Sequence, residues 1–113
     1  MESQLELYDE IANYRAKLQE AMPGAAAAQN ALRDEVYKDG ALSCKSKRLI
    51  AMGIAVRIGC NGCIIGQTKL AVEAGATKDE VLEAVSVAIA MGGTPSRTWA
   101  WRVLKTLEEL GQW

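Results

Sequence analysis

The chain has 113 residues, of which half are hydrophobic and 24% are charged, and its formal net charge at pH 7 is −1. This length and composition predict a single domain, residues 1–113, with one core, and exclude a disordered chain. The near-neutral charge excludes the basic surface of a nucleic-acid-binding protein, since the longest basic cluster is only Lys45-Ser46-Lys47-Arg48.

The expected compartment is the cytoplasm. The first ten residues carry four acidic side chains, which argues against a secretory signal. Charged residues such as Arg57 and Glu83 interrupt the longest apolar stretches, so no segment approaches the roughly 18 residues of a membrane span. In a reducing compartment, a close pair of cysteines indicates redox or metal chemistry more than a permanent cross-link.

The pattern predicts an all-α fold of about six helices, because no apolar run alternates in the manner of a strand. A first helix over 3–21 has an apolar stripe and is expected to stop at Pro23-Gly24. A second, alanine-rich helix is expected over 25–37. The third, over 44–58, takes Ser43 as its N-cap and Gly59 as its end. It is apolar on almost all sides, which predicts a central position, and Gly53 would let a neighbouring helix approach closely.

The second half of the chain has clear helix signals. The cysteine pair at 60 and 63 opens a fourth helix that closes at Gly75. Thr77 and Glu80 fit a capping box for a fifth helix over 78–91. Thr94 and Pro95 predict the N-cap and first turn of a last helix that ends near residue 110. Within it, Trp99 and Trp101 are two apart and cannot share a face, so one is expected to meet solvent or a partner.

Cys60 and Cys63 are the candidate catalytic residues. Two cysteines at this spacing can close a small disulfide or share a metal, and Asn61-Gly62 is interpreted as the tight turn that lets them meet. A helix N-terminus favours negative charge, and the thiolate is the reactive form of cysteine. The alternative is that both are small buried hydrophobes.

Other cofactors have little support in the sequence. There is no histidine and no second close cysteine pair, so a metal held by thiolates would need two protomers to meet. No glycine-rich phosphate loop is present, so no organic cofactor is implied. The third cysteine, Cys44, is interpreted as structural, with a role as an additional resolving thiol as the alternative.

A longer pattern covers about two-thirds of the chain. It comprises Asp39-Gly40-Ala41-Leu42-Ser43, residues 45–50, Gly59-Cys60-Asn61-Gly62-Cys63-Ile64, and Glu73-Ala74-Gly75-Ala76-Thr77-Lys78-Asp79-Glu80 followed by an apolar helix and Gly92-Gly93. In these segments the chain resembles the carboxymuconolactone decarboxylase-like family, in particular its alkylhydroperoxidase D-like (AhpD-like) branch. The resemblance implies an all-helical fold around a helical hairpin, assembled as trimers or hexamers.

The resemblance also implies roles for individual residues. Redox-active members carry a histidine at the position of Gln67 and a glutamate at the position of Arg48, which together activate the second cysteine against peroxide. Cys63 aligns with that peroxide-attacking cysteine and Cys60 with its partner, although without the histidine their roles can reverse. Neither Gln67 nor Arg48 can act as a base near neutral pH.

The function hypothesis is therefore a thiol–disulfide oxidoreductase, or disulfide reductase, that cycles Cys60 and Cys63 between dithiol and disulfide. A positive charge near the sulfurs, from Arg48 or from Arg57, would favour the thiolate. Its electron partner would be a dithiol protein or a small thiol. The alternatives are peroxidase activity of the alkylhydroperoxidase type, with a degenerate proton relay, and a non-catalytic oligomer that binds a partner or holds a metal.

Overall fold

The computed structural model describes residues 2–113, and every regular element in this range is a helix. The elements are α1 (Gln4–Ala21), α2 (Pro23–Val36), α3 (Cys44–Ile58), α4 (Asn61–Glu73), α5 (Lys78–Gly92), α6 (Thr94–Trp99) and α7 (Trp101–Glu109). The predicted all-α class is confirmed. No helix in residues 2–113 has both the length and the apolar character needed to cross a membrane.

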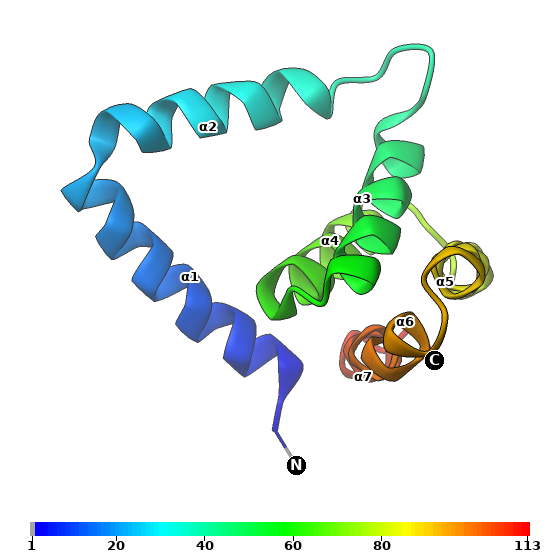
Figure 1. Ribbon diagram of the computed structural model, residues 1–113. Helices are drawn as coiled ribbons and strands as arrows, with labels where there is room; N and C mark the ends of the chain where they lie inside the picture. Colours follow the sequence, from blue (N-terminus) through cyan, green and yellow to red (C-terminus); the bar gives the residue numbers. More distant parts are fainter. Residues whose placement is uncertain (1) are drawn as a thin grey trace.

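The hairpin of α3 and α4 is the centre of the fold (Figure 1). The helix α5 packs on α3, the helix α7 packs on α4, and α6 connects the two. The fully buried hydrophobic side chains come from these helices: Met52, Val56, Ile64, Ile65, Ala71, Val81, Val103 and Leu107. All of them except Ile65 belong to one hydrophobic core cluster.

The first two helices form an arm that leaves this body. In Figure 1, α1, α2 and α3 form three sides of an open triangle, and α2 packs mainly against α1. None of the residues of α2 is buried. The arm is fixed at its base, where Glu109 of α7 accepts hydrogen bonds from the Ser3 hydroxyl and from the backbone N–H groups of Gln4 and Leu5.

Burial acts to raise the pKa of Glu109, but these three hydrogen bonds outweigh it and lower the pKa below its ordinary value. The carboxylate therefore caps the positive end of α1 from another helix. Together with the packing of α1 on α4, this contact holds the base of the arm on the body.

The predicted starts of α3 and α5 are confirmed, because in each a side chain caps its own helix. The Ser43 hydroxyl accepts from the Ser46 N–H at the start of α3, and Thr77 and Glu80 form the predicted capping box of α5. Gly59 ends α3 with a φ of 81°. A Cβ at Gly53 would lie 3.7 Å from the Ala84 carbonyl oxygen, which confirms the close approach of a neighbouring helix.

Three helix boundaries differ from the prediction. The first helix ends at Ala21, as predicted, but the second begins at Pro23 and not at residue 25, because the first turn needs no N–H from the proline. The expected last helix is two helices, α6 and α7, divided at Ala100, where the Val103 N–H bonds to the carbonyl three residues back. The N-cap of α6 is Gly93, not Thr94.

The remaining expectations concern exposure. Trp99 packs against the core and Trp101 is 42% exposed, so the two tryptophans do lie on different faces. The helix α3 is central but not enclosed, because Ile50, Ile54 and Ile58 are at least half exposed. A strongly apolar face of α3 is therefore open in the single chain.

Candidate redox site

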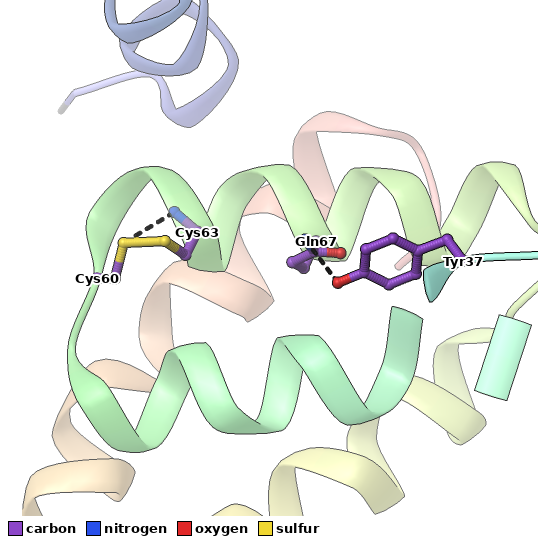
Figure 2. The surroundings of a disulfide bond; sticks show 4 residues. All are labelled: Tyr37, Cys60, Cys63 and Gln67. Atoms are coloured by element: carbon purple, nitrogen blue, oxygen red, sulfur yellow. Dashed lines mark hydrogen bonds between the residues drawn. A yellow bond between two sulfur atoms is a disulfide. The ribbon is translucent and has the colours of Figure 1, made fainter. Parts of the chain in front are cut away.

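Cys60 and Cys63 form a disulfide, with their Cα atoms 5.2 Å apart (Figure 2). The chain reaches it from Gly59, whose left-handed conformation turns the backbone out of α3. Cys60 has extended backbone angles and is the N-cap of α4. The prediction that the pair lies at a helix N-terminus is confirmed in geometry.

The interpretation of Asn61-Gly62 as a separate tight turn is wrong. These two residues are the first of α4. The helix itself brings the sulfurs together, because an N-cap and the third helical residue lie on one side of the first turn. A Cβ at Gly62 would lie 3.3 Å from Ile11, so this turn also packs closely under α1.

The electrostatics at the two sulfurs are unequal. The Cys63 N–H donates a hydrogen bond to Cys60 Sγ at 3.3 Å (Figure 2). After reduction of the disulfide, this N–H and the helix dipole would stabilise negative charge on Cys60. Cys60 is half-buried and Cys63 is exposed, so the disulfide can be reached from solvent.

The structure brings Gln67 and Arg48 together, with Tyr37 as a third member. Arg48 Nη1 donates to Gln67 Oε1 at 3.1 Å, and Gln67 Nε2 donates to the Tyr37 hydroxyl at 3.4 Å. The Arg48 guanidinium lies 3.4 Å from the centre of the Tyr37 ring. In Figure 2, Gln67 lies one turn along α4 from Cys63, between the disulfide and Tyr37. The relay position is thus held by an amide and a guanidinium, neither of which is a base at neutral pH.

A cavity of about 410 Å³ lies directly beside the disulfide, under the arm of α1 and α2. Its lining comes from α1, α2 and α4 and includes both cysteines: Tyr8, Ile11, Arg15, Gln29, Arg33, Cys60, Gly62, Cys63, Gly66, Gln67 and Leu70. We call it the disulfide cavity. The positive charges in its lining belong to Arg15 and Arg33, whereas Arg57 lines a groove between α3 and α5.

The arginines of the disulfide cavity and Tyr37 were missed by the sequence reasoning. Arg15 and Arg33 precede the cysteines by many residues and reach them only because the arm folds back over α4. Tyr37 directly follows α2. A single sequence carries no local signal for such long-range contacts.

Two further features concern cysteine and metal chemistry. The free cysteine, Cys44, lines a separate cavity with Tyr37 and Arg48, and its backbone N–H bonds to Asp39. Within residues 2–113, no group of three histidine, cysteine, aspartate or glutamate side chains could hold a metal ion.

Comparison with known proteins relates the chain to one family. The family model of the carboxymuconolactone decarboxylase family matches residues 23–106. An uncharacterised protein of Cupriavidus necator is 32% identical over 101 residues, which span 89% of each chain. The uncharacterised protein 4 in the cox locus of Paracoccus denitrificans is 38% identical over 80 residues, or 71% of this chain and 72% of that one.

Solved structures agree with the family match. The crystal structure of an apo carboxymuconolactone decarboxylase family protein from Legionella pneumophila has a TM-score of 0.91 at 36% identity, over 96% of this chain and 97% of that one. A protein of the same family from Thermotoga maritima, for which a role in the antioxidative response has been suggested, has a TM-score of 0.79 at 27% identity, over 90% of each chain. The expected fold is confirmed by these likenesses.

Proposed function

The chain belongs to the carboxymuconolactone decarboxylase family, and from the site that it carries we propose that it is a thiol–disulfide oxidoreductase of the cytoplasm. The observation that supports this most strongly is the accessible disulfide at the N-terminus of α4, with an N–H donor on Cys60 Sγ. A permanent cross-link would gain little here, because a disulfide between residues three apart closes only a very short loop.

The dithiol form would react by thiol–disulfide exchange. The Cys60 thiolate attacks one sulfur of a substrate disulfide, the substrate S–S bond breaks, and the first substrate thiolate leaves and takes up a proton. Cys63 then gives its proton to solvent and attacks the Cys60 sulfur of the mixed disulfide, which releases the second substrate thiol. Two electrons pass from the protein to the substrate, and a dithiol protein or a small thiol restores the dithiol.

The neighbouring network suits exchange better than peroxide reduction. Exchange requires a thiolate, which the N–H donor stabilises, but no separate base. Arg48 and Gln67 supply a hydrogen-bonded and positively charged surrounding and no proton acceptor. Peroxide reduction is the second candidate function, because an antioxidative role has been suggested for the Thermotoga maritima relative.

A steady-state assay with three variants tests the proposal. The reduced protein is turned over with a small aromatic disulfide as oxidant and a dithiol as reductant, and hydrogen peroxide replaces the disulfide in a parallel series. We expect Cys60→Ser and Cys63→Ser each to lower disulfide turnover at least about a hundredfold, while Cys44→Ser, the matched control, retains it. Retention of activity in Cys60→Ser would contradict the proposal, and faster turnover of peroxide than of disulfide would favour the second candidate.

We also propose that the chain is a homo-oligomer, a trimer or hexamer. Its solvent-accessible surface is 6872 Å², about 800 Å² more than the roughly 6,100 Å² expected for a monomer of this mass. That excess is about one partner's share of a standard interface. An open groove of about 430 Å³ between α3 and α5, lined by Ile54, Ile58, Val87 and Met91 among others, supplies apolar surface to cover.

Sedimentation equilibrium tests the assembly. We expect the native protein to sediment as a trimer or hexamer and Ile54→Glu to dissociate, because a carboxylate in the groove would be desolvated. Ala90→Glu is the matched control, since Ala90 is exposed on α5 but does not line the groove. A monomeric native protein at micromolar concentration would contradict the proposal.

A further inference from the structure

The disulfide cavity is positively charged without compensation. Arg15 and Arg33 line it, and no aspartate or glutamate does. A neighbouring cavity of about 190 Å³ inside the bend of the arm is also lined by both arginines and by no acidic residue. The wall that the arm presents to the disulfide therefore carries two positive charges and no negative one.

Arg33 is the more informative of the two. It is half-buried, and it lines three adjoining cavities around the arm. Within residues 2–113 no carboxylate lies within ion-pair distance of it, whereas Lys38, Lys45 and Arg102 each have a glutamate partner. A partly buried guanidinium without a partner is a poor arrangement for stability alone, and an anionic ligand would improve it.

The rest of the lining selects an organic ligand. Ile11, Leu70 and the Tyr8 ring are apolar surfaces, and Gln29 and Gln67 supply amide groups. A volume of about 410 Å³ falls in the range of roughly 300–1,000 Å³ that is typical of small-molecule sites. Inorganic anions would leave most of this apolar surface uncovered.

We propose that the disulfide cavity recognises small thiols and disulfides that carry a carboxylate, with Arg33 as the principal anion-binding residue and Arg15 in support. This inference rests on the proposed thiol–disulfide exchange and names its substrate class. The carboxylate lies against the guanidinium of Arg33 while the apolar part of the ligand covers Ile11 and Leu70. The ligand sulfur then faces Cys60 and Cys63 from the same cavity.

The chemistry at the sulfurs is the exchange reaction itself. In the direction that starts from the observed disulfide, one substrate thiolate attacks a cysteine sulfur, the Cys60–Cys63 bond breaks, and a second substrate thiolate attacks the mixed disulfide. Two substrate thiols become one substrate disulfide, and the protein gains two electrons and two protons. No further reactant is needed.

The test compares two thiols on the oxidised full-length protein. The probes are 3-mercaptopropionate, which carries a carboxylate, and 2-mercaptoethanol, which is neutral. The rate of opening of the Cys60–Cys63 disulfide is measured by rapid alkylation and mass spectrometry and expressed per concentration of thiolate. The readout is the ratio of the two rates, in which any general change in disulfide reactivity cancels.

The native protein is expected to favour 3-mercaptopropionate about tenfold, as one charge-assisted contact would provide. Arg33→Gln should bring this ratio near one, Arg33→Lys should keep part of it, and added salt should lower it. Arg97→Gln is the matched control, since Arg97 is exposed on α6 and lines none of these cavities, and it should leave the ratio unchanged.

The outcomes separate this inference from the proposed function. If both thiols open the disulfide at equal rates, or if Arg33→Gln keeps the preference, anion recognition at Arg33 is overturned and the exchange reaction stands. If neither thiol opens the disulfide, the proposed function fails and this inference fails with it. A preference that is equally sensitive to Arg97→Gln also overturns the proposal, because it would reflect overall charge.

Discussion

Gly59 joins α3 to the disulfide, and its replacement by alanine is expected to disturb the fold through two separate effects. The residue has a φ of 81°, which L side chains adopt at a cost. A Cβ there would also lie 2.7 Å from Trp99 Nε1 and 2.9 Å from Trp99 Cε2. Gly75, which follows the C-terminus of α4, has a φ of 97°, and a Cβ there would have nothing within 4 Å. The Gly75→Ala variant therefore measures the first effect alone.

The magnitudes follow from these two environments. A left-handed alanine costs about 1–2 kcal/mol, and the loss of backbone freedom in the unfolded chain returns about 0.4–1 kcal/mol. Gly75→Ala is therefore expected to lower the free energy of unfolding by about 1 kcal/mol. Gly59→Ala adds the displacement of a tryptophan packed on the core, a further cost of about 1–3 kcal/mol.

The assay is urea unfolding of the oxidised protein, followed by circular dichroism, at one protein concentration for all variants. We expect Gly59→Ala to be less stable than Gly75→Ala by at least about 1 kcal/mol. An equal decrease in the free energy of unfolding in the two variants would refute the reasoning, because the clash with Trp99 would then not destabilise the protein.

Three further predictions concern stability. Glu109→Gln should destabilise the protein by about 1 kcal/mol at pH 7. Because the pKa of Glu109 is lowered in the fold, the stabilisation by its carboxylate is present above the ordinary pKa of 4.5 and is lost as the pH falls through the lowered value. Urea unfolding at pH 3 should therefore show a smaller difference between the native protein and the variant, and an equal difference at both pH values would contradict the lowered pKa. Thr77→Ala removes the capping box of α5 and should cost about 1 kcal/mol, as measured by thermal unfolding beside Thr98→Ala, an exposed position in α6, which should change little. Leu107→Ala empties a fully buried site on α7 and should cost about 3 kcal/mol; a loss below about 1 kcal/mol would mean that the core is not packed as described.

The sequence predicted those parts of the fold that depend on neighbouring residues. Ser43 and Thr77 each cap the helix that directly follows them, so a short sequence motif is enough to place the start of α3 and of α5. Pro23 is ambiguous in the sequence, because a proline can lie in the break after one helix or in the first turn of the next. The division at Ala100 was not predicted, because no glycine or proline marks it in the sequence.

The candidate site divides in the same way. Cys60 and Cys63 could be placed at a helix N-terminus because a glycine and two apolar helical segments surround them. The contact of Gln67 with Arg48 joins neighbouring helices, and only the family resemblance placed the two residues at one site. Arg33 could not be predicted, because its place beside the disulfide depends on how the whole arm packs on α4 and α7, far away in the sequence.

The most direct test of the central claim is a redox titration of the native protein. Samples are equilibrated in dithiol buffers of graded potential, free thiols are alkylated, and the mass of peptides containing Cys44, Cys60 and Cys63 is measured. The account predicts that Cys60 and Cys63 titrate together as one reversible two-electron couple, between about −270 and −120 mV, the span of known oxidoreductases, while Cys44 stays outside the couple. A pair that never forms a disulfide, or one that cannot be reduced in this range, would contradict it.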